Sequence, residues 1–160
     1  MRKIIHTLCI ALAASSSSAA PAVEPLHSFT PGSLTQIKQE QAGQSFILFL
    51  WSLDCTYCQA SLEALKAAQL KQGLKIVTIS TDAASEAENR TLISAKLDAV
   101  GLDAKRWAFG PFPAETLRYA IDKKWWGEIP RTYWLDREGR IIHSHAGALT
   151  AEAIRKGFAH

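Results

Sequence analysis

The sequence of 160 residues has few cysteines and little net charge: it contains three cysteines, and its formal charge is +3 at pH 7. No stripe of basic residues is found, so the sequence gives no support to a nucleic-acid partner. It contains no internal repeat, and its length indicates a single domain. The hydrophobic fraction of 48% is ample for a folded core.

The sequence also lacks an apolar run long enough to span a bilayer as a mature helix. Its N-terminal apolar stretch covers only residues 4–14, and two basic residues precede it. Small residues follow, and Ala20 and Ala22 fit the small-x-small pattern of a cleavage site. We therefore expect residues 1–22 to be a secretory signal peptide, cleaved after Ala22, and residues 23–160 to form one domain. The alternatives are a flexible N-terminus and a retained membrane anchor.

Loss of this segment changes both the charge and the cysteine content. The mature chain would keep 16 basic and 15 acidic side chains. It would lose Cys9 and retain Cys55 and Cys58, in a compartment where disulfides persist. A bridge that closes so short a loop constrains the unfolded chain little. A lone adjacent pair is therefore better suited to thiol exchange than to stapling a fold.

Cys55 and Cys58 lie between an apolar run and a run of helix-forming residues, at 46–50 and 59–68. A Cys-x-x-Cys pair at such a junction brings both sulfurs within bonding reach over one helical turn. The exposed amides and the dipole at a helix N-terminus stabilise a thiolate, which is the nucleophilic form. The pattern predicts reversible dithiol–disulfide exchange. Metal binding is the alternative, although a structural zinc ion needs four ligands.

Hydrophobic periodicity and turn residues predict alternating strands and helices along the mature chain. Strands are expected at 45–51, 75–80, 132–135 and 140–145. Helices are expected at 34–41, from Cys55 towards Gly73, at 85–100, at 115–123 and at 151–158. Residues 23–32 are expected to form an extended lead-in, and residues 101–113 an irregular segment.

Local signals support several of these boundaries. Ser33 and Gln36 resemble a capping box for the first helix, and Thr150 resembles an N-cap for the last one. Residues 136–139 resemble a hairpin turn. The strand–helix–strand order around the cysteines implies a right-handed parallel crossover.

Four segments together resemble the exported thiol-disulfide oxidoreductases of the TlpA/ResA-like family, which have the thioredoxin fold. The matching segments are the strand ending in Trp51, the motif Cys55-Thr56-Tyr57-Cys58, residues 129–136, and residues 139–141 with Gly147 downstream. They span about residues 34–157. The resemblance implies an α/β, three-layer fold, with helices on both faces of a central mixed sheet.

The resemblance also implies roles for individual residues. Cys55 would be the attacking cysteine, near solvent at the helix N-terminus, and Cys58 the resolving one, packed one turn further in. Pro130 corresponds to the cis-proline of the fold, and the backbone of Ile129 would accept a substrate strand. Trp51 is assigned to the substrate-binding surface or to the core beside it.

The residues around the pair are expected to tune its chemistry. The side chains of Thr56 and Tyr57 should tune the redox potential. Asp54 stands where many relatives have an aromatic residue, and its negative charge is expected to raise the pKa of the Cys55 thiol.

The sequence has no acid at the positions where relatives place one. Phe49 stands where thioredoxins have a buried acid, and Ser61 stands where ResA-like proteins have one. Glu63 is close in sequence, but we expect it on another, solvated face of the helix.

The favoured function is a periplasmic enzyme that exchanges disulfides, in the direction of reduction. Its partners would be thiols or disulfides of exported proteins, with a membrane electron donor as a further candidate and no cofactor or metal. Relatives of this kind serve cytochrome c assembly or the maturation of copper sites.

The alternative is a Sco-like copper-binding chaperone that uses the cysteine pair and a histidine. His143 and His145 share one face of a predicted strand, and thiolates with imidazole suit copper. Sco-like proteins, however, space their cysteines more widely and place the histidine where this chain has Ile129 and Pro130.

Overall fold

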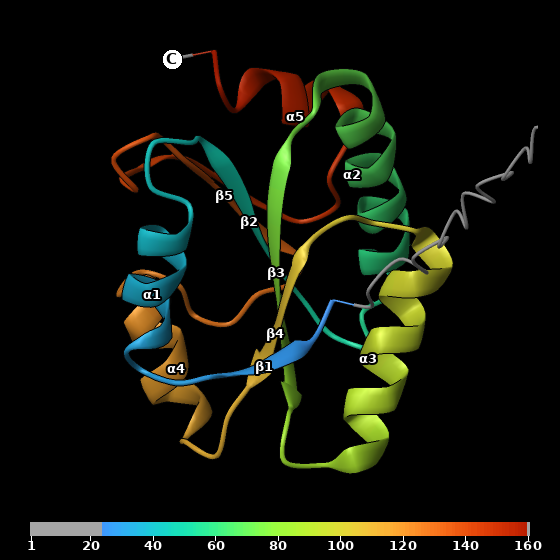
Figure 1. Ribbon diagram of the computed structural model, residues 1–160, viewed down its shortest axis with the longest axis vertical. Helices are drawn as coiled ribbons and strands as arrows, with labels where there is room; N and C mark the ends of the chain where they lie inside the picture. Colours follow the sequence, from blue (N-terminus) through green and yellow to red (C-terminus); the bar gives the residue numbers. More distant parts are fainter. Residues whose placement is uncertain (1–23, 160) are drawn as a thin grey trace, which may run out of the picture.

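The computed structural model describes residues 24–159, so the expected signal peptide at 1–22 lies outside the described residues. Six strands form one mixed sheet in the order β1-β4-β3-β2-β5-β6. Helices α1 and α4 cover one face of the sheet, and α2 and α3 cover the other (Figure 1). The expected three-layer α/β fold is confirmed.

The bounds of the elements follow the chain order. The strands are β1 (Leu26–Phe29), β2 (Phe46–Trp51), β3 (Lys75–Ala83), β4 (Lys105–Phe109), β5 (Arg131–Leu135) and β6 (Ile141–Ala146). The helices are α1 (Ser33–Glu40), α2 (Cys58–Gln72), α3 (Ala87–Val100), α4 (Ala114–Ile121) and α5 (Ala151–Lys156).

Strand β2 lies in the middle of the sheet, and all six of its residues are buried. Its side chains alternate between two hydrophobic clusters. Ile47, Phe49 and Trp51 pack on the side of α2, whereas the side chains between them pack on the side of α1. A strand that is covered on both faces has apolar residues at every position, and this continuous apolar run is why β2 could be predicted from the sequence.

The connections around β2 fix the end of the sheet where the cysteines lie. β2 pairs in parallel with β3 and antiparallel with β5. Helix α2 crosses between the two parallel strands and is capped after Gln72 by Gly73, whose φ of 64° is the left-handed conformation that favours glycine. The chain after β5 returns through the hairpin turn at 136–139 to form β6.

Two strands were missed by the sequence analysis. The extended lead-in contains β1, and the segment expected to be irregular contains β4, which pairs in parallel with both β1 and β3. The strand β4 begins with two charged residues, Lys105 and Arg106, which interrupt the hydrophobic pattern expected of a buried strand. Lys105 lies 2.7 Å from Glu24, and the buried Arg106 lies 2.7 Å from Asp98. Tertiary pairing, rather than local pattern, makes this segment a strand.

The start of α1 differs from the expected capping box. Ser33 is the first residue of the helix, and its hydroxyl oxygen accepts the amide of Thr30 at 2.9 Å. The side chain of Gln36 donates to Glu40 and not to the helix start. The N-cap predicted for α5 is confirmed, because the Thr150 hydroxyl accepts the amide of Ala153 at 3.2 Å.

Candidate functional site

The cysteines occupy the turn between β2 and α2, at the carboxyl end of β2. Leu50 in β2 lies opposite Arg131 in β5, so continuing this antiparallel register places Pro130 opposite Trp51. The turn that carries the cysteines and the segment that leads into β5 therefore meet at one end of the sheet. This proximity brings together two segments that are far apart in sequence.

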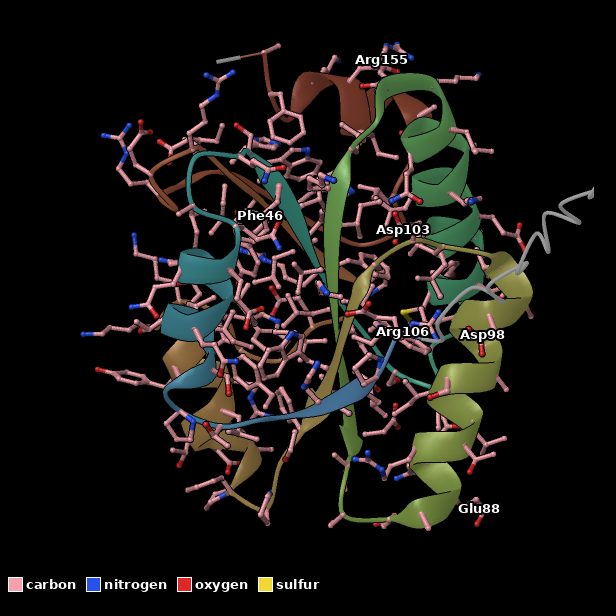
Figure 2. The ribbon with its side chains drawn as sticks, viewed as in Figure 1. Phe46, Glu88, Asp98, Asp103, Arg106 and Arg155 are labelled. Atoms are coloured by element: carbon pink, nitrogen blue, oxygen red, sulfur yellow. A yellow bond between two sulfur atoms is a disulfide. The ribbon has the colours of Figure 1, made fainter. Side chains whose placement is uncertain are left out.

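Cys55 and Cys58 are joined by a disulfide, with sulfur atoms 2.04 Å apart and Cα atoms 5.3 Å apart. The bond is yellow in Figure 2. Cys58 has no exposed surface, whereas Cys55 is half-buried. The disulfide therefore joins a cysteine that has exposed surface to one that has none.

Helix α2 begins three residues later than expected. Cys58 is its first residue rather than a residue one turn inside it, and Cys55 lies in the turn before it. The amide of Cys58 donates to the carbonyl of Cys55 at 3.1 Å, which places the two cysteines across one turn. Cys55 still precedes the amide end of a 15-residue helix, where a thiolate is favoured.

Asp82 holds this turn in place from β3, although the sequence analysis does not identify it as a site residue. Its carboxylate accepts the amide of Leu53 at 2.9 Å and also the hydroxyl of Ser80. The hydroxyl of Thr81 donates to the carbonyl of Trp51 at 3.4 Å. No local pattern in the sequence indicates this contact, because it depends on the parallel pairing of β2 with β3.

The residues expected to tune the pair are on the surface. Asp54, Thr56 and Tyr57 are exposed, and Tyr57 keeps 64% of its surface accessible. Among residues 24–159, no hydrogen bond or ion pair engages the carboxylate of Asp54. Their position beside Cys55 agrees with the expectation, and their effect on the potential stays a prediction.

Trp51 corrects the sequence-based assignment. Its side chain has no exposed surface and packs in the same cluster as Cys58, with the ammonium of Lys96 5.9 Å from the ring centroid. A fully buried ring cannot contact a substrate, so its assignment to the substrate-binding surface is wrong. The ring instead forms the core beneath the cysteine pair.

The positions of the missing acids are filled by other contacts. Phe49 is buried in the core. The hydroxyl of Ser61 donates to the carbonyl of Tyr57 at 2.8 Å and accepts the amide of Leu149 at 3.0 Å. Ser61 therefore ties the first turn of α2 to the segment before α5. Glu63 is exposed and bonds only to Gln59 in α2, as expected for a solvated face.

The peptide bond between Ile129 and Pro130 is cis. Pro130 is buried, and its carbonyl accepts the amide of Gly147 at 2.9 Å. Ile129 is half-buried and packs against the cluster on the α1 side of the sheet. These two residues therefore lie at the same end of the sheet as the cysteines, where the resemblance placed a substrate strand.

Polar contacts fix the segment before Pro130. The hydroxyl of Tyr133 donates to Asp122 at 3.1 Å, and burial, opposed by the positive charge of Arg131, raises the pKa of Tyr133. Arg131 donates to Glu128 at 2.8 Å, and the indole of Trp125 donates to the carbonyl of Glu128 at 2.9 Å. The segment is anchored at both ends.

The two histidines considered as metal ligands, His143 and His145, each have a contact of their own. The ring centroid of His143 lies 5.0 Å from that of Trp134, and Nε2 of His145 lies 3.1 Å from the carbonyl of Ala148. Within residues 24–159, no three histidine, cysteine or acidic side chains gather in a group that could hold a metal ion. Nor does this part of the chain include a helix with the length and apolar character of a membrane span.

Comparison with known proteins identifies the fold. No family model matches the sequence, and no curated protein matches it. Among solved structures, StoA from Bacillus subtilis is 23% identical, with a TM-score of 0.52 over 72% of this chain and 82% of StoA. A secreted thiol-disulfide isomerase from Corynebacterium glutamicum is 18% identical, with a TM-score of 0.61 over 74% of this chain and 71% of that one.

A third structure is a secreted disulfide oxidoreductase from Mycobacterium tuberculosis, described as homologous to E. coli DsbE. It is 14% identical, with a TM-score of 0.58 over 76% of this chain and 84% of that protein. Identities this low establish the shared architecture rather than a shared activity. The chain has the thioredoxin fold.

Proposed function

We propose that this thioredoxin-fold chain is an exported thiol-disulfide oxidoreductase of the TlpA/ResA-like kind, which reduces disulfides of partner proteins through Cys55 and Cys58. The observation that carries the proposal is the bonded pair at the end of β2, with Cys55 half-buried and Cys58 fully buried. A stapling disulfide has no need of this difference in exposure, whereas a two-step exchange does.

In the reduced protein the reaction begins at Cys55. Its thiolate attacks one sulfur of the partner's disulfide, and the other partner sulfur leaves as a thiolate that takes up a proton. Cys58 then loses its proton and attacks Cys55, which breaks the mixed disulfide and releases the second partner thiol. Two electrons and two protons pass to the partner, and the Cys55–Cys58 bond seen here is the product.

Residues around the cysteine pair stabilise the Cys55 thiolate, hold the turn that carries it and accept the partner protein. The amide end of α2 favours the thiolate of Cys55, and Asp82 holds the preceding turn through Leu53. By resemblance, the backbone of Ile129, before Pro130, would accept an extended segment of the partner. An external dithiol donor must return the two electrons after each cycle.

Export and partner class belong to the same proposal. The expected signal peptide supports export, and two of the structural neighbours are described as secreted. The resemblance suggests partners in cytochrome c assembly or in the maturation of copper sites. N-terminal sequencing of the exported product tests the first point, and a mature N-terminus at Val23 is expected.

Insulin reduction by the mature protein, driven by dithiothreitol, tests the proposed activity. Cys55→Ser should abolish the activity above the uncatalysed rate, and Cys58→Ser should accumulate long-lived mixed disulfides. Ser52→Ala is the matched control in the same turn and should retain activity. If the wild type reduces nothing while its reduced form binds one copper ion through His143 or His145, the copper-chaperone alternative replaces this proposal.

A further inference from the structure

The largest exposed aromatic surface outside the cysteine turn belongs to Trp126, 90% of which is accessible. This side chain stands in the segment 122–130, which leads from α4 into β5. Tryptophan is among the residues that contribute most to binding when they become buried at an interface. A tryptophan that is this exposed on a folded surface is therefore a candidate for binding a partner.

A hollow lies beside this side chain. It is about 320 Å³ in volume and is lined by Glu115, Arg118, Tyr119, Lys123, Trp125 and Trp126, which we call the Trp126 hollow. Tyr119 is 59% exposed on α4 and carries the ammonium of Lys123 5.2 Å from its ring centroid. The walls are thus aromatic faces and the aliphatic stems of basic residues, which suit an apolar side chain.

The backbone that presents Trp126 is held on both sides. Trp125, the residue before it, is buried and donates its indole hydrogen bond to Glu128. Asp122 accepts the amide of Lys124 at 2.9 Å, in addition to the hydroxyl of Tyr133. A fixed loop loses little conformational entropy when a partner binds, which is the condition for an efficient docking contact.

The rim of the Trp126 hollow, formed by Lys123 and the adjacent Lys124, is positively charged, and this charge favours an acidic partner segment. Among the described residues, no carboxylate lies within 4.0 Å of Lys123 or Lys124, and both side chains are exposed. Arg118 pairs with Glu115 at 3.2 Å, so the positive charges of Lys123 and Lys124 are left without a carboxylate partner. A segment that carries acidic residues next to an apolar one complements this rim.

The position of the hollow connects it to the redox site. Trp126 lies four residues before Pro130, and a chain of that length spans at most about 14 Å. Pro130 in turn directly precedes Arg131, which pairs with Leu50 one residue before the end of the strand that leads into the cysteine turn. An extended segment of a few residues can therefore cover the distance from the cysteines to the hollow.

We propose that the Trp126 hollow docks an extended, acidic and apolar segment of the protein whose disulfide is exchanged at Cys55, an inference that rests on the proposed function. Tryptophan beside lysines is also the composition of a surface that touches anionic lipid. The hollow favours a polypeptide, because a side chain fills a concave site and a flat bilayer does not.

The test uses three disulfide-linked peptide dimers that differ only in the residues flanking the cysteine: leucine with glutamates, leucine with lysines, and serine with glycines. The single-turnover rate of each is divided by the rate with 2-hydroxyethyl disulfide, which is too small to reach the hollow. The acidic apolar peptide should give a ratio at least about fivefold above the lysine peptide. Trp126→Ser should lower that ratio about fivefold.

Two further variants sharpen the result. The double substitution Lys123→Gln with Lys124→Gln should remove the preference for glutamate over lysine while keeping the preference for leucine. Leu70→Ser is the matched control, because Leu70 is 74% exposed and lies near the far end of α2. It should change no ratio. Circular dichroism confirms that each variant is folded.

Each failure has a separate meaning. If the wild type does not reduce 2-hydroxyethyl disulfide, the proposed function itself is overturned. If it reduces that compound but treats the three peptides alike, the docking proposal fails and the oxidoreductase stands. If the peptides are treated alike and Trp126 instead mediates sedimentation with phosphatidylglycerol vesicles, the surface is a membrane contact and the docking proposal is overturned.

Discussion

Cys55 and Cys58 differ in exposure although they are bonded to each other: Cys55 is half-buried, whereas Cys58 has no exposed surface. An alkylating agent must reach the sulfur, and it reacts with the thiolate. Both conditions favour Cys55, which is accessible and precedes the amide end of α2. This difference in exposure supports the proposed roles of Cys55 as the attacking cysteine and Cys58 as the resolving one.

We expect Cys55 to be alkylated at least about tenfold faster than Cys58 when the reduced, folded protein is treated with limiting iodoacetamide. Peptide mass spectrometry after quenching gives both rates. In urea the two rates should converge, because unfolding exposes both thiols. Faster labelling of Cys58 in the folded protein would reverse the roles assigned here.

Asp82 provides a second prediction at this scale. Asp82→Ala leaves the partly buried amide of Leu53 and the hydroxyl of Ser80 without their acceptor, which should lower the free energy of unfolding by about 1–3 kcal/mol. The looser turn must be ordered before the sulfurs align, so the rate of disulfide exchange should fall about threefold to tenfold.

Two comparisons separate positioning from general destabilisation in this experiment. Asp82→Asn keeps an oxygen acceptor for Leu53 and should recover most of the exchange rate. Asp103→Ala removes an exposed acid elsewhere and should leave the rate unchanged. If Asp82→Ala exchanges disulfides at the wild-type rate, Asp82 does not position the turn.

The cysteine pair and the proline at the end of the sheet could be predicted from the sequence, because a motif marks each of them. Asp82 could not, since its partner Leu53 is 29 positions away and only the parallel pairing of β2 and β3 brings them together. Trp51 was misassigned because proximity in sequence to Cys55 does not reveal on which face of the sheet the ring lies.

At the scale of elements, the segment 122–130 depends on its contact with β5. Tyr133 is buried in β5, and its hydroxyl donates to Asp122 at the start of the segment. Burial raises the pKa of Tyr133 above its ordinary value near 10. This shift links the stability of the contact to alkaline pH.

The sign of that dependence is fixed by linkage. Above about pH 10 the unfolded tyrosine loses its proton while the folded one keeps it, so stability present below pH 10 is lost as the pH rises, by up to about 1.4 kcal/mol per pH unit. Tyr133→Phe should flatten this loss between pH 10 and 11, while costing about 1 kcal/mol at pH 7. Urea unfolding at a series of pH values measures both.

The exposed Tyr119 supplies the control for this experiment. Tyr119→Phe is the same substitution on the exposed surface of α4, and it should leave the free energy of unfolding at pH 7 unchanged. An equal alkaline loss in Tyr133→Phe and the wild type would show that the hydroxyl of Tyr133 is not the group responsible.

Helix α3 is joined to β4 by a pair that is buried on one side only. Figure 2 shows Arg106 between the sheet and α3, and Asp98 on that helix. Nη1 of Arg106 lies 2.7 Å from Oδ1 of Asp98. Asp98→Asn leaves the buried guanidinium without a charged partner. Because Asp98 is half-exposed, we expect a loss of about 1–2 kcal/mol in the free energy of unfolding, less than for a fully buried pair.

A double-mutant cycle with Arg106→Met isolates this interaction. In the Arg106→Met background, Asp98→Asn should hardly lower the free energy of unfolding, because methionine has no charge that could be left unpaired. Glu88→Gln, on the same helix, is the control and should cost little in either background. Equal losses from Asp98→Asn with and without Arg106 would show that the ion pair does not hold α3 on β4.

At the scale of the whole molecule, the fold could be predicted to a large extent because its central parts have local signals. The apolar run of β2, the amphipathic α2 with Gly73 after it, and the hairpin of β5 and β6 each carry one. The two strands at the other side of the sheet carry none: β1 has four residues, and β4 includes Lys105 and Arg106. They become strands because β1 pairs with β4, and β4 also pairs with β3.

The whole molecule presents its chemistry at one end of the sheet, where the cysteine turn, the cis-proline segment and the Trp126 hollow follow one another. The central claim is that the disulfide between Cys55 and Cys58 is a reversible electron carrier and not a permanent staple. Every other proposal made for this protein depends on that reversibility.

The most direct test is a redox titration of the folded, mature protein in glutathione buffers, with the two thiols counted by mass after alkylation. The account predicts one two-electron transition between the disulfide and the dithiol, with circular dichroism unchanged across it and no transition in Cys55→Ser. A disulfide that is reduced only after the protein unfolds, at whatever glutathione ratio, would contradict the account.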